Sequence, residues 1–543
     1  KLAMAIAMTA TVGIAGPVTA TAAAPSVTLE VLGTYASGVF DESAAEIVAH
    51  DPRTQRLFVV NANDASVDVL DILDPTNPVK IATIDATAIG AGANSVAVSR
   101  GIVAVAIEAE DKQANGKVAF YRASDLVLLN TVEVGALPDM LTFTANGQYV
   151  LVANEGEPND DYDVDPEGSV SIIDLRRGVH NASVRTADFK AYIGKEDELR
   201  AKGVRIFGPG ANAAQDLEPE YITVSANSRT AWVALQENNA LAVIDIRRAR
   251  VTDILPLGFK DHSQAGNELD ASNRDDSINI ADWPVLGMYQ PDTIANYKTR
   301  GQRYIVTANE GDARDYDGFS EEERMGDLDL DPVAFPDANE LQENENLGRL
   351  NTTTTLGDAD GDGFYEELYA YGARSFSIWD TKGNLVYDSG SDFEDILADR
   401  IPDYFNSNND DNDSFDARSD DKGPEPEALE VGRIFGRSYA FIGLERVGGI
   451  MVYDITNPHK VVFQDYVNNR DFSKEADSAE AGDLGPESIV FIPWYQSPTK
   501  SPLLAVGNEV SGTTTLYSVK VSWPGRCTPP GLAGRHLPGA CPK

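Results

Sequence analysis

The sequence has few of the residues on which several common kinds of active site depend. It contains two cysteines and five histidines in 543 residues, and they form no cluster with metal-ligand spacing. This scarcity argues against zinc and haem sites. The strings G-x-S-x-G and H-E-x-x-H are missing, and so are Gly-rich phosphate and dinucleotide loops. A serine hydrolase, a zinc protease and a nucleotide-dependent enzyme therefore find little support.

Basic residues are also scarce relative to acidic ones. The chain has 44 Lys and Arg against 86 Asp and Glu, a formal net charge of −42. Nucleic acid is excluded as a partner, because phosphate backbones are bound by basic surfaces. Such an excess of carboxylates fits cation binding or an acidic, solvated surface in a salty habitat.

The only long apolar segment lies at the N-terminus, where residues 1–24 predict a signal peptide. Its apolar part is too short to span a bilayer, and no later stretch is apolar enough. We therefore expect an extracellular or periplasmic protein without a membrane span, starting near Pro25, with cell-surface association left open. Cys527 and Cys541 are expected to pair within the Pro/Gly-rich tail, residues 521–543.

A pattern of short apolar strands recurs seven times. The units begin at Ala45, Asn94, Pro138, Glu218, Pro291, Pro426 and Pro486. Most open with an acidic residue, and turn residues separate their strands. Four antiparallel strands in each of seven units predict an all-β, seven-bladed β-propeller. A pair of β-sandwiches is the alternative, although it does not explain the recurring Pro-acid opening.

The last unit lacks a fourth strand of its own, and residues 27–38 supply a candidate. An N-terminal strand in this place would close the ring and remove the open edge of the last blade. The propeller is expected to span residues 25–520. Two acidic insertions, 311–363 and 391–425, interrupt it, and segments of this length are either functional or disordered.

Carboxylates recur at two equivalent positions of the units. One set opens the first strand: Glu46, Asp139, Glu220, Asp292, Glu427 and Glu487. The other set follows the second strand: Glu155, Glu237, Glu310, Glu445 and Glu509. Around a propeller axis, such like charges take up protons or hold a cation. We predict metal ligands at Glu155, Glu220, Glu237, Glu310, Glu427, Glu445, Glu487 and Glu509. Oxygen ligands favour Ca²⁺, or else Mg²⁺ or another hard divalent ion. Turn capping is the alternative at any single position.

The string "GDADGDGFYEELY" contains half of a calcium loop. Asp358, Asp360 and Asp362 alternate before Gly363, and Glu366 takes the ninth position. The twelfth position is Tyr369 rather than Glu, so the EF-hand pattern is incomplete. We predict a calcium site here, and a solvated acidic loop is the alternative.

Several basic residues stand inside the acidic strings. Arg314, Arg374, Arg446, His262 and Lys260 are the candidate catalytic residues, because a guanidinium beside a metal binds phosphate or carboxylate oxygens. Arg418 and Lys422 occur in similar surroundings, "RSDDKGPEPE". Pairing of each with a local carboxylate is the alternative.

The strings "LEPEYITVS", "TANEGDARDY", "GLERVGGIMVYD" and "GNEVSGTTTLYSV" resemble the choice-of-anchor I family of bacterial secreted and surface proteins. The resemblance covers about Val27 to Val519. It implies a β-propeller, and some relatives are alkaline-phosphatase-like. The family's C-terminal anchors are not matched here, because no LPxTG-type or PEP-type tail is visible, so free secretion is expected.

Two functions fit these features. The first is a calcium-dependent hydrolase of phosphoric esters, acting as a monomer on a small phosphorylated substrate, and the sequence leans towards it. The second is a non-catalytic, calcium-stabilised module that binds a surface glycan or a matrix protein. Clustering separates the two, because catalysis requires the arginines and the acids in one pocket.

Overall fold

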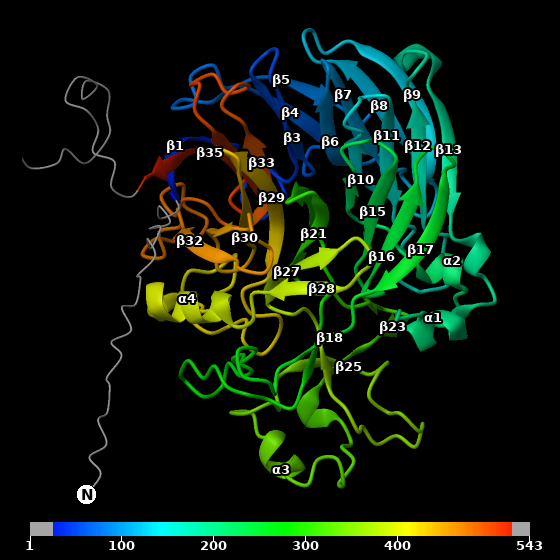
Figure 1. The fold of residues 1–543 in the computed structure, drawn as a ribbon, viewed down its shortest axis with the longest axis vertical. Coiled ribbons are helices and arrows are strands. Elements are labelled where there is room, and N and C mark those ends of the chain that lie inside the picture. The colour runs from blue at the N-terminus through cyan, green and yellow to red at the C-terminus, as the bar shows by residue number, and fades with distance from the viewer. Residues whose placement is uncertain (1–24, 524–543) are drawn as a thin grey trace, which may run out of the picture. The chain divides into compact units, whose positions relative to one another are not determined.

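The computed structural model describes residues 25–523 (Figure 1). The chain divides into two units, one of Thr28–Val519 and one of the two ends, Lys1–Val27 with Lys520–Lys543. The predicted signal peptide and the two cysteines lie outside the described residues. Within residues 25–523, no helix is long and apolar enough to cross a membrane.

Seven four-stranded sheets make up most of the described chain, which confirms the predicted all-β class. The first three contain β2 (Val48–Asp51), β3 (Arg56–Asn61), β4 (Ser66–Asp71), β5 (Val79–Asp85); β6 (Ala93–Ser99), β7 (Ile102–Ile107), β8 (Asn115–Arg122), β9 (Leu128–Ala136); and β10 (Pro138–Phe143), β11 (Tyr149–Asn154), β12 (Ser169–Asp174), β13 (Ser183–Asp188). All strand pairs within these three sheets are antiparallel.

The other four sheets follow in chain order. They contain β14 (Ile222–Val224), β15 (Thr230–Leu235), β16 (Ala240–Asp245), β17 (Arg250–Pro256); β20 (Ile294–Thr299), β21 (Gln302–Asn309), β27 (Ser375–Asp380), β28 (Leu385–Asp388); β29 (Pro426–Ile434), β30 (Arg437–Leu444), β31 (Ile450–Asp454), β32 (Val462–Val467); and β33 (Pro486–Ile492), β34 (Leu503–Asn508), β35 (Thr513–Ser522), β1 (Ser26–Ala36). In the seventh sheet the N-terminal strand β1 lies beside β35.

Alternation along the strands explains how the sheets pack. In β3, Phe58 and Val60 join an apolar cluster with the second sheet, whereas Leu57 and Val59 join one with the seventh. Successive side chains of a strand point to opposite faces, so a strand that is apolar throughout buries both of its faces. Each sheet is therefore held between two others, and burial of apolar surface stabilises the stack.

The first strands of the sheets meet one another in a cyclic order. Contacts join β2 to β6, β6 to β10, β10 to β14, β14 to β20, β20 to β29, β29 to β33, and β33 to β2. In Figure 1 the sheets follow one another around this unit from blue through green to orange. The opening residues of the first strands are thereby brought towards a common region.

The long connections carry further elements. A five-stranded sheet contains β18 (Phe259–Asp261), β19 (Leu286–Met288), β26 (Tyr369–Ala370), β25 (Asn351–Thr353) and β24 (Glu322–Arg324), and β22 (Asp315–Tyr316) pairs with β23 (Phe319–Ser320). The helical segments are η1 (Val179–Asn181), η2 (Lys190–Tyr192), α1 (Glu196–Lys202), α2 (Ala213–Asp216), η3 (Met325–Asp327), α3 (Ala338–Leu341), α4 (Asp392–Arg400) and η4 (Pro402–Tyr404). Residues of the 311–363 stretch, among them Met325, Leu347 and Leu350, share an apolar cluster with Leu269, Val285 and neighbouring residues of the preceding connection.

Candidate functional site

The structure places both predicted sets of acids at the ends of strands. The opening acids lie within two residues of the start of each first strand, and Glu155, Glu237, Glu310, Glu445 and Glu509 lie one or two residues after a second strand. The backbone is tight here: Gly311 has φ +97°, and a Cβ on it would lie 2.1 Å from Gly372 N. Only glycine fits at this position directly after Glu310.

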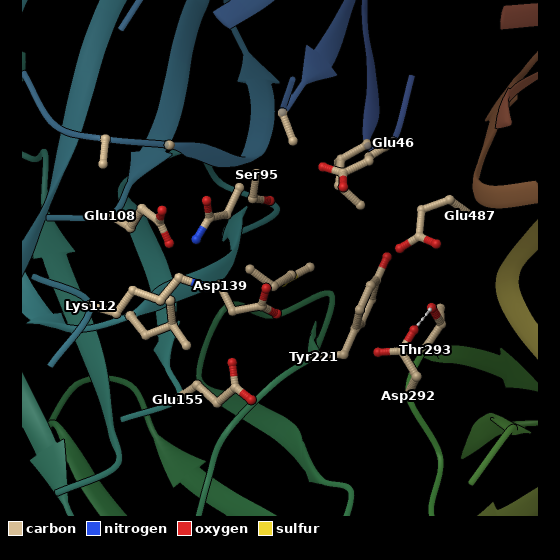
Figure 2. Close-up of a pocket in the computed structure, with 17 residues that line it drawn as sticks. Glu46, Ser95, Glu108, Lys112, Asp139, Glu155, Tyr221, Asp292, Thr293 and Glu487 are labelled. Carbon is tan, nitrogen blue, oxygen red and sulfur yellow. Dashed lines mark hydrogen bonds between the residues drawn. The ribbon is translucent and has the colours of Figure 1, made fainter. Parts of the chain in front are cut away.

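A cavity of about 420 Å³ lies among the opening acids (Figure 2). Its acidic walls are formed by Glu46, Glu108, Asp139, Glu155, Asp292 and Glu487. Strand register shifts directly after the prolines that precede Asp139 and Glu487, and such bulges re-aim side chains. Figure 2 shows the ring of Tyr221 reaching into this group. Burial, with neighbouring carboxylates, raises the pKa of Glu46 to about 8 and that of Asp139 to about 7.

Glu155, Glu220 and Glu237 form a group that we call the open triad. One carboxylate oxygen from each lies within 4.8 Å of the others. Glu220 is 6% and Glu237 3% exposed, and the Oε2 atom of each is buried without a hydrogen-bond partner. No basic side chain of the described chain forms an ion pair with any of the three. Burial, and then neighbouring carboxylates, raise the pKa values of Glu155 and Glu220 well above the ordinary range.

Glu310, Glu425 and Glu445 form a second group of the same size, which we call the paired triad. Lys422 stands within it: its Nζ lies 2.8 Å from Glu310 Oε1 and 3.1 Å from Glu425 Oε2. The ammonium also donates to the carbonyl of Gly311 at 2.7 Å. A cation of the chain itself therefore occupies the position that a metal ion could take.

Two arginines complete the neutralisation of the paired triad. Arg418 Nη2 lies 2.6 Å from Glu425 Oε1, and Arg446 Nε lies 3.0 Å from Glu425 Oε2 and 3.2 Å from Glu445 Oε2. Burial alone would raise the pKa of Glu425, but Lys422, Arg418 and Arg446 hold it down to about 2. Glu425 is thus a permanently charged centre of an ion-pair network.

The remaining predicted ligands of the two recurring sets are Glu427, Glu487 and Glu509. Asp292, Glu310 and Glu427 also bring one oxygen each within 4.8 Å, and Glu427 Oε2 has no partner. Burial raises the pKa values of Asp292, Glu427 and Glu487 well above their usual range, and nearby carboxylates add to this. Burial raises the pKa of Glu509 as well. These groups resist ionisation unless a cation is near.

The half calcium loop lies apart from the triads. Asp358, Asp360 and Asp362 place one oxygen each within 4.8 Å, and two of the three are exposed. Asp358 already accepts from the backbone N–H groups of residues 361, 362 and 363. Glu366 accepts from Ala359 N at 2.8 Å and does not join the group. The predicted calcium role of this loop stays a prediction.

Arg314 is buried in a pair of ion pairs. Its side chain is 1% exposed; Nη1 lies 2.5 Å from Asp216 Oδ1 and Nη2 lies 2.9 Å from Glu218 Oε2. The guanidinium also lies over the ring of Phe207, 4.5 Å from its centroid. Burial by itself would lower the pKa of Arg314, but Glu218 and Asp216 raise it well above its ordinary value. This arginine holds two loops of the chain together.

The other predicted catalytic residues are also engaged by the chain. Arg374 pairs with Glu394 at 2.7 Å, and Lys260 Nζ donates to two carbonyls and pairs with Asp388 at 3.2 Å. His262 is buried, its Nδ1 lies 2.6 Å from a backbone carbonyl, and burial lowers its pKa. Arg446, which pairs with Glu425 and Glu445, also lines a cavity of about 280 Å³.

Sequence reasoning missed Glu218 and Glu425 as partners of these cations. A signal for both was present, because each begins the tripeptide Glu-Pro-Glu, in "LEPEYI" and "PEPEAL". The second Glu of each tripeptide is the predicted opening acid, and the first pairs with arginine in the structure. Asp312 was missed as well: burial raises its pKa to about 8, Lys422 opposes the rise, and Glu237 adds to it.

The chain is similar in sequence to two animal proteins. It is 34% identical over 192 residues to Gigasin-3a of Magallana gigas, covering 33% of this chain and 67% of that one. It is 26% identical over 363 residues to the mesenchyme-specific cell surface glycoprotein of Strongylocentrotus purpuratus, covering 57% of this chain and 45% of that one.

Two solved structures resemble the chain at low sequence identity. Hydrazine synthase of Kuenenia stuttgartiensis has 13% identity and a TM-score of 0.44, over 90% of this chain and 99% of that one. The β-propeller domain of Cps50 (Swd1) of Myceliophteria thermophila has 11% identity and a TM-score of 0.42, over 91% and 100%. The family model of the choice-of-anchor I domain matches residues 46–458, and the chain belongs to that family.

Proposed function

We propose that the seven sheets are the blades of a β-propeller, that β1 completes the last blade, and that the protein acts outside the cell. The cyclic contacts of the first strands and the place of β1 beside β35 support the propeller. Membership of the choice-of-anchor I family and similarity to a protein named a cell surface glycoprotein support the location.

In this proposal the open triad holds a hard divalent cation, with calcium as the first choice. Two observations carry it: among residues 25–523, Glu220 and Glu237, both more than nine-tenths buried, each keep an Oε2 without a hydrogen-bond partner, and each brings one carboxylate oxygen within 4.8 Å of one of Glu155. Buried carboxylates without a hydrogen bond or counter-charge are costly, and a cation among them removes the cost. Carboxylate oxygens alone suit Ca²⁺ or Mg²⁺.

The cation would serve the hydrolysis of phosphoric esters. A divalent ion supplies charge to phosphate oxygens and makes a bound water more acidic. Arg446 supports this role, because it lines a cavity that it shares with Asp312, and the pKa of Asp312 is raised partly by Glu237 of the open triad. Asp312 is thus within electrostatic reach of the open triad and shares a cavity with Arg446.

A non-catalytic, calcium-stabilised binding module is the second candidate. The burial of Arg314 and Arg374 in ion pairs favours it, because guanidinium groups that are 1% and 4% exposed are out of reach of a substrate in solution. This candidate requires the cation and the fold, but no phosphate pocket.

Hydrolysis of p-nitrophenyl phosphate and of phytate by the full chain, with calcium and after EGTA, tests the proposal. Glu220→Gln should lower the calcium-dependent rate by about 100-fold or more. Glu480→Gln is the matched control, because that side chain is 76% exposed. A melting temperature that rises with calcium, without turnover under any divalent metal, would exclude the hydrolase and retain the module. A melting temperature that does not respond would exclude the cation site in both.

A further inference from the structure

A second, smaller cavity lies beside the paired triad and carries an unusual density of cations. Its volume is about 280 Å³, and its walls are formed by Asp312, Ala313, Glu322, Tyr371, Arg418, Asp421, Lys422 and Arg446. Arg418 and Arg446 are 19% and 26% exposed at their side chains, so the cavity can be reached from solvent.

Both arginines keep a terminal nitrogen free of protein acceptors. Arg418 donates from Nε and Nη2 to Glu425 Oε1, at 2.8 and 2.6 Å. Arg446 donates from Nε to Glu425 Oε2 and from Nη1 to Asn409 Oδ1. Among residues 25–523, Arg418 Nη1 and Arg446 Nη2 thus have no hydrogen-bond acceptor.

Glu425 orients these two guanidinium groups without occupying all of their N–H donors. It is fully buried and accepts from both arginines, one on each carboxylate oxygen. A planar guanidinium fixed through one edge presents its remaining N–H groups in a defined direction. Lys422, held between Glu310 and Glu425, adds a third positive charge to the same wall.

The three acids that line the cavity each have partners of their own. Asp312 accepts a hydrogen bond from Ala313 N at 2.8 Å, and Glu322 accepts one from Asn351 Nδ2 at 2.7 Å. Asp421 is already paired with Arg418 at 2.8 Å. Among residues 25–523, none of these three acids accepts a hydrogen bond from Arg418 Nη1 or Arg446 Nη2.

We propose that Arg418, Lys422 and Arg446 form a binding site for one tetrahedral oxyanion, phosphate or sulfate, either free or at the end of an ester. The site deepens the proposed function by naming where the phosphate group of an ester sits, and it rests on that function for this role only. Binding of a free ion requires no catalysis. A cavity at the small end of the range for ligand pockets fits one such group and excludes a polyanion.

Calorimetric titration of the full chain with inorganic phosphate, after EGTA and again with calcium, tests the site. We expect a Kd of about 1 mM or tighter. Arg446→Lys keeps the charge beside Glu425 but removes the free Nη2, and should weaken phosphate binding by about tenfold. Arg418→Gln should weaken it at least as much. Arg248→Gln, at a side chain that is 79% exposed, should leave it unchanged.

The outcomes separate the site from the proposed function. No phosphate binding by the wild type, or equal binding by folded Arg446→Lys, overturns the site even if esters are hydrolysed. Phosphate binding that depends on Arg446, without turnover, keeps the site and excludes the hydrolase. If Arg418→Gln does not fold, the wild type and Arg446→Lys decide. Titration with sulfate and with phenyl phosphate distinguishes the free ion from the ester terminus.

Discussion

The open triad and the paired triad both bring three carboxylates close together, but they differ in how the negative charge is balanced. Each gathers three carboxylates with oxygens within 4.8 Å, at strand ends of the same unit. The paired triad contains Lys422, and two arginines flank it. Within residues 25–523, the open triad has no such cation, and two of its oxygens are buried without a hydrogen-bond partner.

The difference shows that crowding of acids alone does not identify a metal site. In the paired triad the pKa of Glu425 is held at about 2, as expected for a carboxylate that is already neutralised. In the open triad the pKa of Glu220 is raised well above its usual range, as expected for a carboxylate that still lacks a counter-charge. Acids with unmet charge are the better candidates for an external ion.

The largest expected effect comes from removing the internal cation of the paired triad. Lys422→Met should lower the free energy of unfolding by about 3–5 kcal/mol, because it leaves Glu310 and Glu425 buried without their ammonium. Urea unfolding at pH 7 measures it. Lys474→Met is the control, because its pair with Glu480 is exposed and is worth under about 1 kcal/mol. Equal losses in the two variants would show that the paired triad does not depend on Lys422.

Calcium should act on the open triad and not on the paired one. At a concentration of about 100 times its Kd, calcium should stabilise the wild type by about 2.7 kcal/mol. Glu220→Gln should lose this increment, and Glu445→Gln should keep it, whatever each substitution does to the metal-free protein. Thermal unfolding with calcium and with EGTA gives the increments. The reverse pattern would assign the ion to the paired triad.

The acids that lack a counter-charge should make the stability of the protein depend on pH. The folded-state pKa values of Glu46 and Asp139, about 8 and about 7, lie above the ordinary values of 4.5 and 3.8. Their contribution to stability is therefore complete below about pH 4 and is lost as pH rises through 7 and 8. In EGTA, these two groups together should lower the free energy of unfolding by about 6 kcal/mol between pH 5 and 8.

Two variants sharpen this pH prediction. Asp139→Asn should reduce the slope, because the amide does not titrate. Glu425 titrates in the opposite sense: its lowered pKa adds stability above about pH 4.5, which is lost as pH falls towards 2. Urea unfolding midpoints measured from pH 2 to 8 report both the loss of stability at low pH and the loss above pH 5. A stability that increases from pH 5 to 8 in EGTA would contradict the assignment of unmet charge to the opening acids.

The smallest effect is expected at the half calcium loop. Asp360→Asn should lower the number of calcium ions bound per chain by one, as measured by equilibrium dialysis. It should change stability by less than about 1 kcal/mol, because two of the three carboxylates are exposed. An unchanged stoichiometry would leave the loop as a solvated acidic turn.

Much of the fold could be predicted because its signal is local. Strands such as β3 are apolar at every position from Leu57 to Val60, and both faces of that strand are buried in the structure. The recurring opening acids marked the start of six of the seven units. Repeats of this kind need no long-range information, since each unit carries the same pattern of strands and turns.

The partners of the arginines could not be predicted in the same way. Arg314 and Asp216 are separated by 98 residues, and neither position repeats among the units. Whether a buried arginine faces a substrate or a carboxylate of the chain depends on how the long connections fold. No local sequence pattern predicts how they fold. The same limit explains why Glu425 was missed although its Glu-Pro-Glu string was visible.

Anomalous diffraction from crystals grown with calcium, or with a heavier ion of similar ligand preference, tests the central claim most directly. We predict an anomalous peak bound by Glu155, Glu220 and Glu237, with metal–oxygen distances of about 2.3–2.6 Å for calcium. We predict no peak within the group of Glu310, Glu425 and Glu445, where Lys422 remains. A peak in the paired triad, or an open triad that stays without an ion at saturating calcium, would contradict it.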